Sequence, residues 1–95
     1  MIIATYDIEL FGMSNEFASL RHVEVELHDD ATLGEIVAAL RAKAPALEGK
    51  IIRPGEDRLT SHYSFNVNGR FHIEEYDVKV HPGDHVLVLT FALGG

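Results

Sequence analysis

The last two residues, Gly94 and Gly95, are the first feature that could do chemistry. Glycine has no Cβ, so such a tail can lie flat in a tunnel too narrow for any other side chain. The carboxylate of Gly95 would then be the one group that another protein's active site could take in deeply. Two terminal glycines alone are more often a frayed end or a remnant of an expression tag. Their meaning depends on the domain that carries them.

Histidines and paired carboxylates are the other candidates for chemistry. Four histidines form two pairs, one on a predicted strand face and one around a predicted turn: His22 and His28, and His81 and His85. A zinc site needs three or four converging ligands with supporting contacts, so solvated histidines are the favoured interpretation and no metal site is predicted. Glu74-Glu75 and Asp29-Asp30 could suggest acid–base work. Adjacent strand residues point to opposite faces, which favours solvated surface instead.

Composition sets the class of protein. The chain has 95 residues, which suits one domain, and we expect residues 1–95 to form it. The lack of cysteine excludes a disulfide scaffold, a thiolate zinc site and a cysteine nucleophile. The net charge of -7 argues against nucleic-acid binding and favours a basic partner surface. Because we find neither a membrane-spanning apolar run nor a signal peptide, we predict a soluble, cytoplasmic protein.

Alternating apolar residues predict two strands early in the chain. Apolar and polar residues alternate over 2–11, and they alternate more cleanly over 21–28. A period of two over such lengths is typical of a half-buried strand. In the second strand Val23, Val25 and Leu27 should face the core. Two such strands in a row, joined by a loop of roughly ten residues, favour antiparallel pairing.

A short helix is predicted after Thr32. Thr32-Leu33-Gly34-Glu35 fits a capping box, in which the threonine hydroxyl accepts from the Glu35 N–H and the glutamate accepts from the Thr32 N–H. An apolar stripe continues at helical spacing: Leu33, Ile36, Val37 and Leu40. Pro45 ends the helix. A helix of this length depends on packing against a sheet.

The second half of the chain predicts a hairpin. Residues 63–67 alternate, and Asn68-Gly69 after them is the strongest short signal for a type I′ turn. The segment 45–62 is irregular, with an exposed turn at 53–57 and three expected anchors: Leu47, Ile51 and Ile52. These elements predict an α+β domain, with one main helix packed on one face of a mixed sheet.

The last predicted strand, residues 85–93, is apolar on both faces. Val86 and Val88 face one way, whereas Leu87, Leu89 and Phe91 face the other. One short helix cannot cover both faces of a sheet, so one of these sets should remain as a binding patch. The alternation itself does not say which set is buried.

Several short motifs occur in a characteristic order. They are the Thr32–Glu35 helix start, Phe65-Asn66-Val67-Asn68-Gly69, the Pro82-Gly83-Asp84 turn and the final Gly94-Gly95. In this order, over almost the whole chain, they resemble the MoaD/ThiS family of ubiquitin-like sulfur carrier proteins. The resemblance implies the β-grasp fold. It also implies that Val86 and Val88 pack under the helix, whereas Leu87, Leu89, Phe91 and Leu93 contact a partner.

The resemblance further implies that Gly95 is the reacting residue. In this family a partner activating enzyme uses ATP, with Mg, to adenylate the C-terminal glycine, and sulfur then displaces AMP to leave a thiocarboxylate. A synthase or large subunit uses that sulfur in making molybdopterin, the thiamine thiazole or cysteine. By position, Gly95 is the acceptor and Gly94 the flexible residue before it. The chain has no phosphate loop, so we expect no cofactor on the chain itself and a carrier rather than an enzyme.

Two features distinguish this chain from many members of that family. Residues 90–93 are bulky and contain no proline, and residues 45–62 make the chain longer than thiamine-type carriers. The added length favours a molybdopterin-type or cysteine-type carrier. Two other functions stay open: a ubiquitin-like modifier joined through Gly95 to lysines of target proteins, and a non-catalytic interaction subunit, which the bulky approach to the tail would suit.

Overall fold

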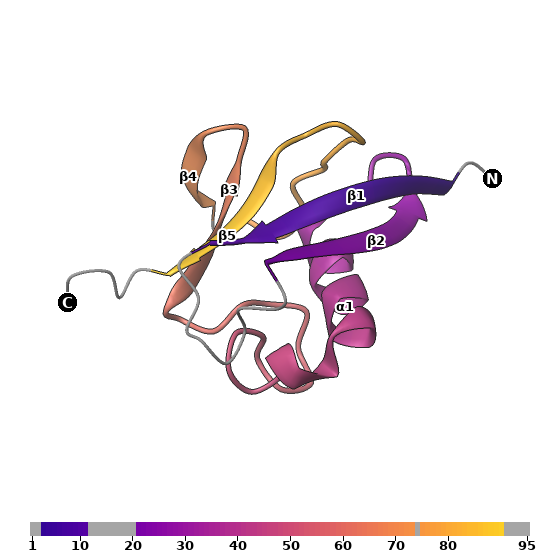
Figure 1. The fold of residues 1–95 in the computed structure, drawn as a ribbon. Helices are drawn as coiled ribbons and strands as arrows, with labels where there is room; N and C mark the ends of the chain where they lie inside the picture. Colours follow the sequence, from indigo (N-terminus) through magenta and orange to yellow (C-terminus); the bar gives the residue numbers. More distant parts are fainter. Residues whose placement is uncertain (1–2, 12–20, 74, 91–95) are drawn as a thin grey trace.

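The fold is a five-stranded mixed sheet with one helix across it (Figure 1). The computed structural model describes residues 3–11, 21–73 and 75–90. The elements are β1 (Ile3–Leu10), β2 (His22–His28), α1 (Leu33–Lys43), the 3-10 helix η2 (Pro45–Leu47), β3 (Tyr63–Val67), β4 (Arg70–Ile73) and β5 (Val86–Thr90). The α+β arrangement expected from the sequence is therefore confirmed.

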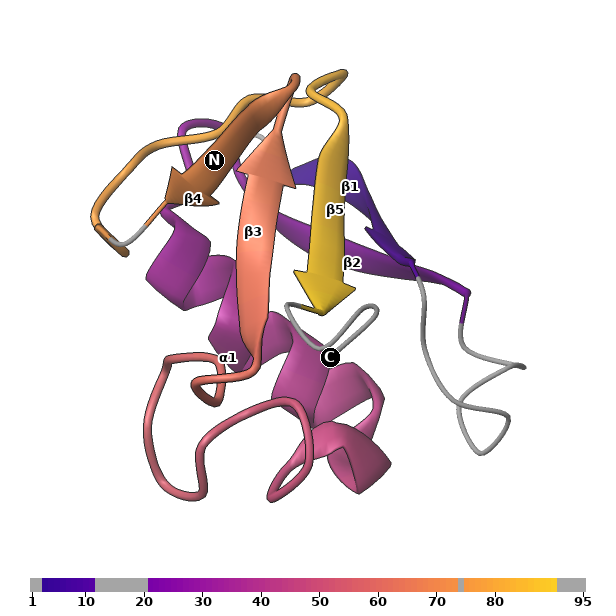
Figure 2. The ribbon, with the colours of Figure 1, turned by 90° about the vertical axis from the view of Figure 1, so that its left-hand side faces the viewer.

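The first and last described strands pair at the centre of the sheet. The strand order is β2-β1-β5-β3-β4, with β1 and β5 parallel and every other neighbouring pair antiparallel. Figure 2 shows β3, β4 and β5 in front and α1 behind them, so the helix covers one face only. We call this the covered face and the opposite side the open face. The predicted antiparallel pairing of the first two strands is confirmed.

Helix α1 begins at the predicted capping box. The Thr32 hydroxyl accepts from the Glu35 N–H at 3.2 Å, and the Glu35 carboxylate accepts from the Thr32 N–H at 3.0 Å. The buried side chains are the predicted stripe: Leu33, Ile36, Val37 and Leu40. These residues pack on the covered face, where the largest completely buried strand side chains are Phe65 and Ile8.

Two turns at one end of the sheet are hydrogen-bonded to each other. Asn68 and Gly69 have φ values of 52° and 90°, which agrees with the predicted type I′ turn. The Asn68 side chain accepts from the His85 N–H at 2.8 Å and donates to the Asp84 carboxylate at 3.1 Å. The backbone N–H of His81 donates to the same carboxylate and, with Asn68, lowers the pKa of Asp84. The β3–β4 hairpin thereby fixes the chain where it enters β5.

The irregular segment after α1 is anchored rather than loose. The predicted anchors Leu47, Ile51 and Ile52 are buried. Arg41, in the last turn of α1, donates to the Asp57 carboxylate at 3.0 Å and to the Glu56 carbonyl, so it connects the helix to the exposed turn. Within the described residues, no helix is long and apolar enough to cross a membrane.

Candidate interaction face

Strand β5 shows its two sets of residues in different environments. Val86 and Val88 are completely buried on the covered face, whereas Leu87 and Leu89 are partly exposed on the open face. The packing predicted for the two valines is confirmed. Contact of the two leucines with a partner stays a prediction. The other predicted site residues, Phe91, Leu93, Gly94 and Gly95, lie outside the residues that the structure describes.

Leu87 lies in a row that crosses three strands. Glu9 of β1 is on one side of it and Asn66 of β3 is on the other. The Asn66 side chain is buried and accepts from the Gly69 N–H at 2.9 Å. In the next row, Ser64 lies beside Leu89 and donates its hydroxyl to the Phe65 carbonyl at 3.3 Å. Because the Asn66 amide oxygen and the Ser64 hydroxyl already have partners, covering them with an apolar surface would not leave these two groups without a hydrogen bond.

Sequence reasoning missed Phe11, an aromatic side chain that is 52% exposed. Its N–H donates to the Val88 carbonyl at 3.0 Å, so Phe11 continues the β1–β5 pairing beyond the last residue of β1. The alternation of side chains along β1 puts Phe11 on the same face as Glu9 and Leu87. The signal was available, because Phe11 is the one aromatic residue in the otherwise polar set at positions 5, 7, 9 and 11.

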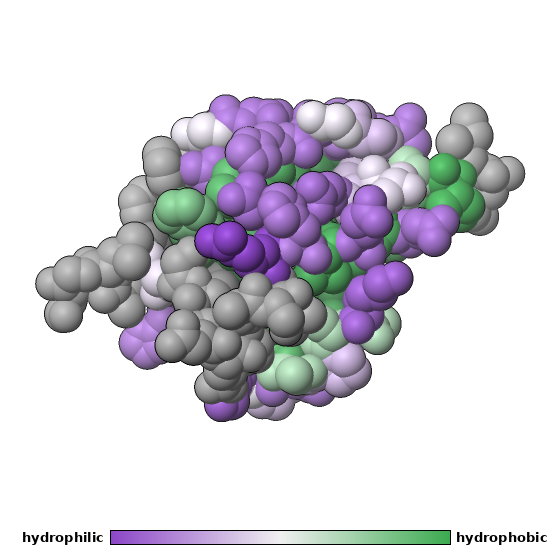
Figure 3. Space-filling view, in the orientation of Figure 1, coloured by the Kyte–Doolittle hydropathy of each residue, from purple (hydrophilic) through white to green (hydrophobic). Residues whose placement is uncertain are grey.

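Carboxylates cover the other half of the open face. Asp7 and Glu9 of β1 share it with Glu24 and Glu26 of β2, and Asp7 is directly opposite Glu24. Figure 3 shows hydrophilic residues over much of the described surface in the orientation of Figure 1. Two of the acids contact histidines: Asp7 lies 3.2 Å from His22, and Glu9 lies 3.3 Å from His85. The open face therefore places an acidic half beside the apolar residues of β5.

Two further histidines, His28 and His81, contact carboxylates near the start of α1. His28 Nε2 lies 2.7 Å from Glu35, and this hydrogen bond is the main cause of a raised pKa for His28. Two hydrogen bonds lower the pKa of Glu35: the larger effect comes from the Thr32 N–H and the next from His28. His81 Nε2 lies 2.8 Å from Asp30. No group of three or more of these residue types could hold a metal ion within the described ranges.

Asp29 and Asp30 do not lie in a strand, so the strand geometry expected for them is wrong. Both residues lie in the turn after β2, where Asp30 has a φ of 67°. Their predicted exposure to solvent is nevertheless confirmed. Aspartate tolerates this left-handed conformation better than most residues, so the pair serves the turn that leads into α1.

Similar structures share this fold over nearly their whole length. Small archaeal modifier protein 1 from Haloferax volcanii superposes with a TM-score of 0.77 at 27% identity, covering 97% of this chain and 100% of the other. A protein described as molybdopterin converting factor subunit 1, from Pyrococcus furiosus, has a TM-score of 0.65 at 18% identity, covering 92% and 97%. These likenesses show the ubiquitin-like β-grasp fold.

Sequence comparison gives the family. Small archaeal modifier protein 3 from Haloferax volcanii is 28% identical over 91 residues, which are 94% of this chain and 97% of the relative. The model of the ThiS family matches residues 8–95, a range that includes both terminal glycines and the whole of β5. The chain therefore belongs to the ThiS family.

Proposed function

We propose that this chain is a sulfur carrier whose Gly95 carboxylate is converted to a thiocarboxylate on a partner activating enzyme. The observation that carries the proposal is the family match, which extends to Gly95 at the end of the sequence. In the fold, β5 ends at Thr90, five residues before Gly95. Extended, five residues span up to about 17 Å, enough to enter an enclosed active site while the domain stays outside.

The chemistry requires an activated carboxylate. A carboxylate oxygen of Gly95 would attack the α-phosphorus of ATP, held with Mg on the partner, and pyrophosphate would leave. Hydrosulfide would then attack the acyl carbon of the adenylate, and AMP would leave with the bridging oxygen. The products are AMP and a thiocarboxylate, with no net oxidation or reduction when hydrosulfide is the donor. The activating enzyme must enclose the adenylate because water would otherwise hydrolyse it.

The open face is our candidate for docking this enzyme and the synthase or large subunit that takes the sulfur. Leu87, Leu89 and Phe11 supply apolar area beside the start of the tail. The acids of β1 and β2 would attract a basic partner surface and speed association. We further propose that the chain acts in the cytoplasm and supplies molybdopterin-type or related biosynthesis, a choice supported by the added segment at 45–62.

A second candidate is a protein modifier joined through Gly95 to lysine amines. It is favoured by the name of the relative small archaeal modifier protein 3, which this chain matches over 94% of its length. The same acyl-adenylate serves both functions, and they differ in whether sulfur or an amine finally receives the acyl group. One chain could carry out both.

The test is an intact mass after incubation with ATP, Mg, a host activating enzyme and sulfide. The expected result is a shift that corresponds to one oxygen replaced by sulfur, absent when Gly95 is deleted. Circular dichroism of the deletion variant must match that of the full chain. An unchanged mass with each host activating enzyme would overturn the sulfur-carrier proposal. Slow-migrating adducts in lysates that require Gly95 would then establish the modifier function.

A further inference from the structure

The two edges of the sheet differ in how open they are to another strand. At one edge, β4 has four residues and its register with β3 is irregular. At the other edge, β2 has seven residues in regular register with β1 and contains neither proline nor bulge. Every second residue of β2 directs its N–H and C=O away from β1. Among the described residues no strand pairs with these groups, so β2 is a template for β-strand addition.

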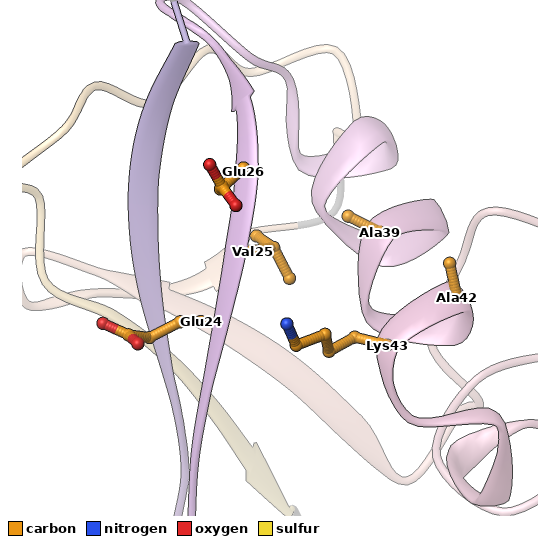
Figure 4. Close-up of a pocket in the computed structure, with 6 residues that line it drawn as sticks. All are labelled: Glu24, Val25, Glu26, Ala39, Ala42 and Lys43. Carbon is orange, nitrogen blue, oxygen red and sulfur yellow. The ribbon is translucent and has the colours of Figure 1, made fainter.

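A hollow of about 350 Å³ lies beside this edge, between β2 and α1 (Figure 4). We call it the β2–α1 groove; it is lined by Glu24, Val25, Glu26, Ala39, Ala42 and Lys43. The two alanines keep the helix side shallow. In Figure 4, Val25 and the Lys43 side chain lie between the strand and the helix, whereas Glu24 and Glu26 point away from the helix. A strand added here would therefore meet apolar groups on one face and carboxylates on the other.

The charged residues of the groove indicate which side chains an added strand should carry. Glu24, Glu26 and Lys43 form no ion pair within the part of the chain that the structure describes. Side chains of an added strand would lie directly beside Glu24 and Glu26, where opposite charges stabilise and like charges destabilise. Basic residues therefore suit the open side of the occupant. Apolar residues suit the side toward Val25 and Ala42, with a carboxylate where it can reach Lys43.

A second copy of this chain fits poorly at the same edge. Two β2 strands paired antiparallel about Val25 would place Glu24 of each copy beside Glu26 of the other. The net charge of -7 adds a general repulsion between copies. The charge pattern thus favours a different protein.

We propose that the β2–α1 groove binds an extended segment of a partner protein that adds to β2 as a strand and alternates apolar with basic side chains. This contact is separate from the chemistry of Gly95 and from the leucines of β5. It would let the chain hold one partner at the β2 edge while β5 and the tail are engaged elsewhere.

The experiment uses NMR titration of the isotope-labelled full chain with two synthetic peptides. One alternates valine with lysine and ends on aspartate; the other alternates valine with glutamate. We expect the basic peptide to shift amide signals of residues 22–28 and 39–43 and to slow hydrogen exchange at outward-facing amides of β2. Its affinity should fall as salt is raised. The acidic peptide should bind at least about tenfold more weakly, given two like-charge cross-strand contacts.

Matched variants test the location. Ala42→Glu fills the groove and should raise the Kd of the basic peptide about tenfold. Ala46→Glu, at an exposed alanine of η2 outside the groove, makes the same change in charge and should leave binding unaltered. The double variant E24K/E26K should reverse the preference between the two peptides. Thermal melts must show that each variant is folded.

Three outcomes would overturn the proposal. They are equal binding of both peptides, full binding by Ala42→Glu, and shifts that centre on Leu87 and Leu89 instead of β2. Concentration-dependent shifts of residues 22–28 without peptide would instead identify a second copy as the occupant. A variant that lacks Gly95 should bind the basic peptide normally, which separates this test from that of the sulfur-carrier function.

Discussion

The two faces of the sheet show how one strand can serve folding and recognition at once. On the covered face, β5 contributes Val86 and Val88, both completely buried. On the open face it contributes Leu87, beside Glu9, and Leu89, beside Ser64, and both leucines stay partly exposed. The residue types are alike, so their roles are set by which face α1 covers. Substitutions on the covered face should therefore report on stability, and those on the open face on binding.

The largest effect is expected at the covered face. Ile8→Ala removes a completely buried side chain of β1 and should lower the free energy of unfolding by about 2–5 kcal/mol, through lost apolar burial and the cavity left behind. Urea denaturation measures it. A loss below about 1 kcal/mol would mean that the covered face repacks freely. It would contradict the assignment of stability to the covered face and of binding to the open face.

The next effect concerns the cap that positions α1 over the covered face. Thr32→Ala removes the hydroxyl that accepts from the Glu35 N–H and should cost about 1 kcal/mol. Ser61→Ala, at an exposed turn residue, is the control and should change stability by less than about 0.5 kcal/mol. Equal losses in the two variants would show that the cap is not what stabilises the helix.

A smaller change in stability, with a larger change in function, is expected at the open face. Leu87→Ala should lower the free energy of unfolding by less than about 1 kcal/mol, because the side chain is already partly in water. If this face docks the activating enzyme, the variant should form thiocarboxylate about tenfold more slowly, because it lacks one important contact of the interface. The rate is measured by intact mass over time. An unchanged rate would show that the enzyme docks on another surface.

The smallest effect is the pH dependence of the His28–Glu35 pair. The pKa of Glu35 is lowered in the fold, so its contribution is present above the unfolded value of 4.5 and is lost as pH falls through the folded pKa. The pKa of His28 is raised, so its contribution is present below 6.5 and is lost as pH rises through the folded pKa. The pair should therefore stabilise most between these values.

Thermal melts across the acidic and neutral range measure this dependence. Glu35→Gln should flatten the change in Tm on both sides of that window, and Glu56→Gln, which alters an exposed acid of the turn at 53–57, should not. Identical profiles for Glu35→Gln and the unaltered chain would show that the pair does not couple to folding.

Local signals explain why much of the fold could be predicted from the sequence. The capping box at Thr32 and the turn at Asn68-Gly69 each depend on residues a few positions apart, and the structure has both. Alternation likewise predicted the strand at residues 63–67. What it could not supply was register, which is set between distant strands. The contacts of Glu9 with His85 and of Asp7 with His22 depend on that register.

The candidate site, like the fold, could be predicted only in part from the sequence. The burial of Val86 and Val88 followed from the family resemblance and not from periodicity, since both sets of β5 are apolar. Phe11 lies inside the predicted range 2–11 but was missed because only the alternating buried set of that strand was read, and its pairing with β5 shows only in the hydrogen bond from its N–H to the Val88 carbonyl. The reactive role proposed for Gly95 comes from the family alone, because residues 91–95 lie outside the described structure.

The parallel pairing of β1 with β5 has a consequence for how the chain folds during synthesis. The two central strands come from opposite ends of the described sequence, Ile3–Leu10 and Val86–Thr90. Until β5 has left the ribosome, β1 and β3 each lack a central neighbour, and closing so long a loop slows folding. The nascent domain cannot complete its sheet before almost all of its residues are translated. An activating enzyme that recognises the completed open face would thus not bind chains that are still being synthesised.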